Sequence, residues 1–282
     1  MPTAVVTDST AYLPAELAGM HTLTVVPLTV VINGREAREG DEVTPAEVAK
    51  ALSARRVAVS TSRPNPEQFA QTYRRLLDRG ADAVVSVHLS ARLSGTVEAA
   101  TIAAGGFGGL VEVVDARSTG MGLGFPALAA DAAAARGADA AQVRQAALDA
   151  IDRTLAFFYV DTLEFLRRGG RINAASALLG TALSVKPILH MVEGGIVLRD
   201  KVRTASRGLA RLADLAVQAA GDREVDIAVH HLAAAAPAEQ LADTLAERLG
   251  SRLRDRYLTE IGAVVAVHAG PGLICVVVHR RD

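Results

Sequence analysis

Short runs of β-branched and small apolar residues alternate with helical segments over residues 4–115, and this alternation constrains the fold more than any other feature. The extended runs lie at residues 4–7, 23–32, 57–59, 83–87 and 111–114, and helical segments begin near Pro14, Thr44, Asn65 and Gly95. Strands that alternate with helices indicate a mostly parallel sheet covered by helices on both faces. The dipeptide Asn33-Gly34 adds a local signal for a hairpin turn.

The second half of the chain follows a different pattern, in which hairpins are mixed with helices. Strands are predicted at residues 157–160 and 225–230, a hairpin at 188–198, and helices at 204–220 and 238–249. This mixture is typical of an α+β domain with a mixed or antiparallel sheet. We therefore predict an α/β protein of two domains, an N-terminal α/β domain over residues 1–154 and a C-terminal α+β domain over residues 155–282.

Residues 261–278 contain no Asp, Glu, Lys or Arg and are about as long as a membrane span. Gly270-Pro271-Gly272 interrupts this stretch, so we expect two short strands joined by a turn that also holds His268. The N-terminus has no signal-peptide pattern, and the protein is expected to be soluble and cytoplasmic. The single cysteine, Cys275, lies in an apolar run and is expected to be a small core residue.

Charge and motifs exclude several classes of function. The net charge of −1 argues against a general nucleic-acid binder. The sequence has no P-loop and no nucleophile elbow, and its glycines at residues 120–124 have the wrong spacing for a dinucleotide site, so no cofactor is expected. His230 and His231 are adjacent in a predicted strand and point to opposite faces, so no metal site is expected. His88 and His190 lie alone in apolar surroundings and are interpreted as structural.

Hydroxyl side chains dominate the ends of the predicted strands. They occur at residues 8–10, 60–62 and 90–96. In an open parallel sheet, ligands bind beyond the carboxyl ends of the strands. Hydroxyls donate to a carboxylate or phosphate without adding charge, and Thr96 opens a helix whose N-terminus favours an anion. Ser and Thr also cap helices, so capping and ligand binding both remain open here.

Basic residues cluster in the second half, beginning with Arg167, Arg168 and Arg171. Further along, Arg203, Arg207 and Arg211 are spaced by four residues and are predicted to share one helix face. This face is either solvated or a docking surface for an acidic or phosphate-bearing partner.

Several stretches, in order across nearly the whole chain, resemble the DegV family, the fatty-acid-binding subunits of the bacterial fatty-acid kinase. The stretches are Val6-Thr7-Asp8-Ser9-Thr10, Thr61-Ser62-Arg63-Pro64, Leu93-Ser94-Gly95-Thr96, Gly169-Gly170-Arg171-Ile172, Lys186-Pro187-Ile188-Leu189, Lys201-Val202-Arg203-Thr204 and His268-Ala269-Gly270-Pro271-Gly272. The family often has Gln in place of Arg63.

The resemblance implies a two-domain α/β protein that encloses a long-chain fatty acid such as palmitate or oleate. Thr61 and Ser94 would hydrogen-bond the carboxylate, with Ser62 and Thr96 in the same cluster and His268 beside them. A separate ATP-dependent kinase would convert the carboxylate to an acyl-phosphate. This chain is therefore expected to be a carrier and not an enzyme, with at most transient contact with a membrane surface.

Three arginines, Arg171, Arg203 and Arg207, are the predicted docking residues for that kinase. Burial of a 16-carbon tail could contribute on the order of 10 kcal/mol, against about 1.5–3 kcal/mol for each hydrogen bond to the carboxylate. The tail would then set the affinity, and the hydroxyls would orient a headgroup with no positive charge against it. A small hydrolase or phosphotransferase that uses Asp8 or Ser94 as nucleophile is the alternative.

Overall fold

The computed structural model describes residues 2–54, 57–62, 64–172 and 185–281, so Arg63 lies outside the described residues. The chain divides into two compact units. Unit 1 comprises Met1–Thr29 and Ser62–Asp152, and unit 2 comprises Val30–Thr61 and Arg153–Asp282. The division after Asp152 lies close to the boundary expected at residue 154, whereas the sequence offered no sign that residues 30–61 group with the second half.

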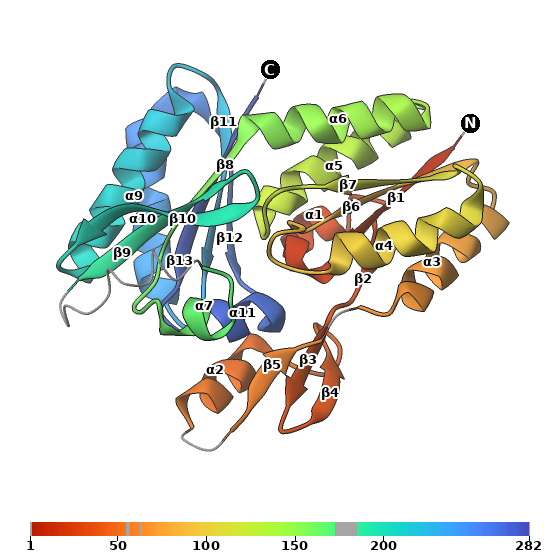
Figure 1. The fold of residues 1–282 in the computed structure, drawn as a ribbon. Helices are drawn as coiled ribbons and strands as arrows, with labels where there is room; N and C mark the ends of the chain where they lie inside the picture. The colour runs from red at the N-terminus through yellow and green to blue at the C-terminus, as the bar shows by residue number, and fades with distance from the viewer. Residues whose placement is uncertain (1, 55–56, 63, 173–184, 282) are drawn as a thin grey trace. The chain divides into compact units, whose positions relative to one another are not determined.

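Unit 1 is built on a parallel sheet (Figure 1). Its strands are β1 (Thr3–Asp8), β2 (Thr24–Val26), β6 (Ala83–His88) and β7 (Val111–Asp115), in the order β2-β1-β6-β7. All three neighbouring pairs are parallel. Its helices are α1 (Ala15–Ala18), α3 (Pro66–Asp78), α4 (Thr96–Ala104), α5 (Met121–Ala135) and α6 (Ala140–Arg153). Helices α3 and α4 bury apolar side chains of one sheet face, and α5 packs on β1 and β6, which confirms the predicted class.

Unit 2 contains a six-stranded mixed sheet of order β10-β9-β8-β13-β11-β12. The strands are β8 (Thr154–Tyr159), β9 (Lys186–Val192), β10 (Gly195–Val202), β11 (Val225–His231), β12 (Leu253–Glu260) and β13 (Ile274–Arg280). Helices α9 (Ala205–Ala220) and α10 (Ala235–Leu249) bury one face of this sheet (Figure 1). Strands β9 and β10 form the predicted antiparallel hairpin, whereas β12 was not predicted.

The segment of residues 30–61 adds a small sheet of order β4-β3-β5 and one helix to unit 2. The elements are β3 (Thr29–Ile32), β4 (Arg35–Arg38), α2 (Pro45–Ser53) and β5 (Val59–Thr61). Asn33 and Gly34 have φ angles of 51° and 81°, as the predicted hairpin turn requires. Strand β5 pairs antiparallel with β3, so the prediction that Thr61 ends a strand of the parallel sheet is wrong.

The prediction of two strands over residues 261–278 is also wrong in its first half, because a helix, α11 (Ala263–Ala269), precedes β13. His268 therefore lies in the last turn of a helix and not in a loop. Valines favour strands, but the half-buried positions Gly262, Val265 and His268 recur every three residues, as they do on a helix with one buried side. Helix α11 packs on α2 and α7 (Glu164–Arg168), and this tertiary packing outweighs local propensity. No helix among the described residues is long and apolar enough to span a bilayer.

Candidate ligand-binding site

Unit 2 brings together Thr61 and His268, two residues that the family resemblance implied for the site. Thr61 is the last residue of β5, and its Oγ1 lies 3.0 Å from His268 Nε2 on α11. The pair opens into a pocket of about 210 Å³. The other residues that line this Thr61–His268 pocket are Leu52, Val59, Ser60, Phe165, Arg168, Gly169, Arg171 and Val267. The pocket is smaller than the roughly 300–1,000 Å³ of sites that enclose a whole small ligand, and it therefore suits a headgroup.

The close packing of α7 against α11, which carries His268, requires glycine at two positions. A Cβ atom on Gly169, just after α7, would overlap the His268 ring, so this position must lack a side chain. Gly270 follows α11 with a φ of +76°, and a Cβ there would overlap the Phe165 ring. These close approaches explain why glycine stands at both positions and why α7 and α11 can lie against each other.

His268 is neutral at pH 7 in this environment. Burial lowers the pKa of its imidazole to about 4, and the positive charge of Arg171 lowers that pKa further in the same direction. A neutral imidazole has one N–H, so its Nε2 either donates to Thr61 or accepts from it. If Nε2–H donates, the Thr61 hydroxyl proton is free to bind an anion in the pocket.

Two arginines, Arg168 and Arg171, also line the pocket. An anionic headgroup bound there would therefore meet positive charge, which the expectation of a carboxylate held without a positive charge against it did not include. Arg171 is half-buried, its guanidinium donates to the Gly169 carbonyl, and burial lowers the pKa of the guanidinium. An arginine nonetheless stays charged in proteins and can meet a carboxylate with two parallel hydrogen bonds. Sequence spacing cannot place Arg171 beside Thr61, and its predicted role in partner docking stays a prediction.

The remaining predicted hydroxyls lie in unit 1. Ser94 is half-buried, and its Oγ lies 2.9 Å from Thr96 Oγ1. Thr96 is the first residue of α4, as predicted, but it is fully buried and can orient Ser94 more readily than it can meet a ligand. The side chain of Ser62 is half-buried, and its backbone N–H donates to the Thr29 carbonyl.

Asp8 is held as a structural group. It is fully buried, and its two oxygens accept from the Thr10 amide and hydroxyl, the Leu89 amide and His88 Nδ1 at 2.5–3.0 Å. The other ring nitrogen of His88, Nε2, lies 2.7 Å from Ser86 Oγ, and the Tyr73 hydroxyl donates to the same Ser86 oxygen. A carboxylate enclosed and bonded in this way cannot attack a substrate. Ser94 hydrogen-bonds another hydroxyl and not a general base, so the geometry also gives little support to Ser94 as a nucleophile.

The other histidines considered above and the single cysteine also have contacts typical of structural residues. His230 Nδ1 lies 3.0 Å from Thr259 Oγ1, and the His190 ring stacks on Phe157. Burial raises the pKa of the Cys275 thiol to about 12, which keeps it protonated and unreactive. Among the residues that the structure describes, no group of three or more His, Cys, Asp or Glu side chains could hold a metal ion.

The three arginines predicted to share a helix face are arranged differently. Helix α9 begins at Ala205 because the Thr204 side chain accepts from the Arg207 amide, so Arg203 lies before the helix and its assignment to a helix face is wrong. Arg211 Nε is 2.7 Å from Asp200 Oδ2 and forms an ion pair. Arg203 and Arg207 are exposed on either side of the Thr204 cap.

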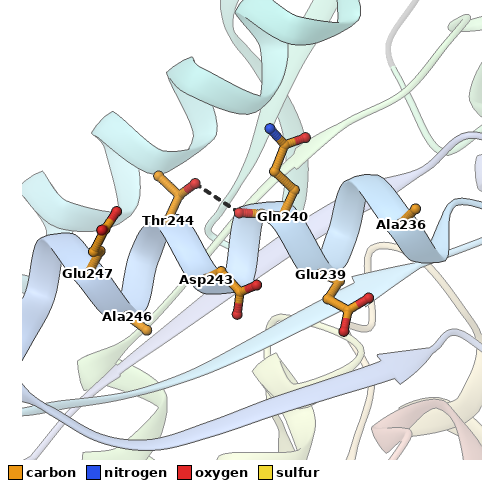
Figure 2. Close-up of a pocket in the computed structure, with 7 residues that line it drawn as sticks. All are labelled: Ala236, Glu239, Gln240, Asp243, Thr244, Ala246 and Glu247. Atoms are coloured by element: carbon orange, nitrogen blue, oxygen red, sulfur yellow. Dashed lines mark hydrogen bonds between the residues drawn. The ribbon is translucent and has the colours of Figure 1, made fainter.

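A second hollow, of about 650 Å³, lies on α10 (Figure 2). Glu239, Asp243 and Glu247 are spaced by four residues along this exposed helix and line it. Asp243 pairs with Arg256, but Glu239 and Glu247 repel an anionic headgroup, and the shallow surface cannot enclose an acyl chain. The Thr61–His268 pocket is therefore the better candidate for an anionic ligand.

Comparison with known proteins identifies relatives over the full length. The family profile described as "Uncharacterised protein, DegV family COG1307" matches residues 2–281. A DegV domain-containing protein of Streptomyces coelicolor is 52% identical over 278 residues, which cover 99% of this chain and 98% of the relative.

Two solved structures share the fold with full coverage of both chains. A DegV family protein from Thermus thermophilus, described for its fatty acid binding, is 34% identical with a TM-score of 0.91. DegV from Bacillus subtilis, described as a fatty acid binding protein, is 30% identical with a TM-score of 0.89.

Proposed function

This chain belongs to the DegV family, and from that premise we propose that it binds one long-chain fatty acid, such as palmitate or oleate, as a carrier. The observation that carries the proposal is the Thr61–His268 pair at 3.0 Å in a pocket that two arginines line. The fatty acid binding described for the relatives from Thermus thermophilus and Bacillus subtilis supports the ligand class.

The proposed headgroup chemistry follows from the neutral His268. Its Nε2–H donates to Thr61, and the Thr61 hydroxyl donates to the carboxylate. Arg171 supplies the positive charge that a buried carboxylate needs, since an unpaired charge is costly away from water. The apolar side chains of Phe165 and Val267, which line the same pocket, would meet the first methylene groups.

Ser94 is proposed as a further hydroxyl donor to the carboxylate, with Thr96 orienting it through their 2.9 Å contact. Ser62 is also proposed to belong to the cluster of hydroxyl side chains around the carboxylate. We propose that the acyl tail is enclosed with a contribution from the second half of the chain. Tail burial at about 0.8 kcal/mol per CH₂ would then set the affinity, and the headgroup contacts would set the orientation.

The chain is proposed to be a substrate carrier, with the chemistry carried out by a separate ATP-dependent kinase in the cytoplasm. A carboxylate oxygen would attack the γ-phosphorus of ATP, the bond to the bridging oxygen would break, and ADP would leave. The exposed Arg203 and Arg207 are proposed to dock this partner, because exposed charge steers association with an acidic surface. In the bound carrier, Arg171 would lie beside the phosphoryl acceptor.

Native mass spectrometry of protein purified from bacteria tests the proposed function. We expect a mass increment that matches a fatty acid, lost on delipidation and restored by added palmitate. A clean apo mass, together with no calorimetric response to palmitate or oleate, would refute the carrier function. Release of phosphate or of an acyl product by the purified chain alone would favour the enzyme alternative.

A further inference from the structure

Helix α11 is fastened to the segment of residues 30–61 at both of its ends. At its start, Glu39 Oε1 accepts from the Val264 amide at 2.7 Å. Toward its end, His268 meets Thr61 at 3.0 Å. Val264 and His268 are four residues apart, one turn of a helix, and both partners belong to the same 32-residue stretch of unit 2, Val30–Thr61.

Glu39 is an unusual place for a helix cap. Its carboxylate is buried, with only 6% of the residue exposed, and it lies 225 positions before its partner. The residue that precedes α11 is Gly262, which has no side chain to satisfy the first amides of the helix. A carboxylate at this end also interacts favourably with the helix dipole. The distant Glu39 therefore performs the capping that the local sequence does not provide.

The cap fixes the position of α11 along its own axis. Glu39 directly follows β4, in the sheet that also carries Thr61 on β5, and its backbone bridges to Val43. A shift of α11 away from Glu39 would therefore also change the distance from His268 to Thr61. Since a hydrogen bond weakens steeply beyond about 3.2 Å, even a small shift would matter.

We propose that Glu39 is a positioning residue for the Thr61–His268 pair, and this inference rests on the proposed function of that pair. Glu39 does not touch the ligand. It fixes the position of α11 along the helix axis, so that His268 Nε2 lies within hydrogen-bond distance of Thr61. With Nε2–H as the donor, the Thr61 hydroxyl proton points to the pocket.

Nitrogen NMR of the His268 ring, combined with palmitate calorimetry on the full chain, tests the proposal. Glu39→Ala should shift the Nε2 resonance and weaken palmitate binding by roughly tenfold. Glu39→Gln should restore most of both, because its amide oxygen still accepts from Val264. Glu36→Ala, on the exposed β4 of the same sheet, is the matched control and should change neither.

The outcomes separate cleanly. An unchanged Nε2 resonance in folded Glu39→Ala overturns the proposal, whether or not affinity falls, because a loss of affinity alone would reflect general loosening. If Glu39→Ala does not fold, Glu39→Asp decides, since its shorter side chain should shift the same resonance, and an unshifted resonance overturns the proposal. If Thr61→Val binds palmitate like the wild type, the proposed headgroup site fails, while the ring resonance still reports on Glu39.

Discussion

Replacing Thr61 by valine removes one hydroxyl from the Thr61–His268 pocket and keeps the β-branched shape that suits β5. The variant loses the proposed donor to the carboxylate and the partner of His268 Nε2, which lies 3.0 Å away. Because both residues are half-buried, water can replace the lost partner in the free protein. The cost to folding should therefore be small, about 0.5–1.5 kcal/mol.

The cost to binding should be larger. A hydrogen bond to a charged carboxylate contributes about 1.5–3 kcal/mol, which corresponds to a roughly 10- to 150-fold increase in Kd. Each methylene group contributes about 0.8 kcal/mol, or roughly fourfold, and Thr61 does not contact the tail in the proposed pose. A plot of log Kd against chain length should therefore keep its slope in Thr61→Val and move to weaker binding by a constant amount.

Calorimetry with a series of saturated fatty acids measures both the slope and the offset. Thr259→Val is the matched control, because Thr259 Oγ1 also lies 3.0 Å from a histidine nitrogen, that of His230, on a strand of the same unit and outside the pocket. Because His230 is buried, the control should lose at least as much stability as Thr61→Val, and it should keep wild-type affinity. Equal affinities of Thr61→Val and wild type across the series would refute the headgroup assignment, and a changed slope would place Thr61 against the tail.

Three further predictions concern the same proposal. Ser94→Ala should weaken palmitate binding by about 1–3 kcal/mol in calorimetry, and unchanged affinity would remove Ser94 from the site. The folded-state pKa of His268, about 4, lies below the unfolded value near 6.5, so the unfolded chain binds more protons between these values. The free energy of unfolding should therefore fall as the pH is lowered from 6.5 to 4. Burial also lowers the pKa of His230 and His279 to about 4, so His268→Gln should remove only its own share of this fall in urea titrations. An equal slope in both proteins would contradict the assignment. Arg203→Ala combined with Arg207→Ala should leave the melting temperature and fatty-acid affinity intact and slow acyl-phosphate formation by the partner kinase at limiting carrier. Arg248→Ala, an exposed arginine paired with Asp214, is the control for that assay, and full activity of the double variant would make the two arginines a merely solvated pair.

Local chemistry made much of the fold predictable. The Asn33-Gly34 turn and the capping box of Thr44 with Glu47 are decided by a few neighbouring residues, and both occur as predicted. Helix α11 is stabilised by contacts with distant parts of the chain, namely its packing on α2 and the cap from Glu39. Its own sequence is rich in valine, which favours a strand, so local propensity predicted the wrong element. Strand β12 escaped prediction because it is an edge strand whose charged residues hide the usual alternation.

The residues of the candidate site also differ in how far the sequence could predict them. Thr61 and His268 were found through the family resemblance, and their contact is a feature of the fold that no spacing predicts. The positive charge of Arg171 in the pocket and the cap by Glu39 were missed, because each depends on residues far away in the chain.

The separation of Thr61 and His268 by 207 positions also sets an order of events during synthesis. At about 5–20 residues per second, Thr61 is made roughly 10–40 s before the histidine that it meets. During that interval β5 and α2 lack the helix on which they pack, and their apolar side chains are available to chaperones or to other chains. The Thr61–His268 pocket is therefore incomplete until α11 has been made, and contacts of such long range are expected to slow folding.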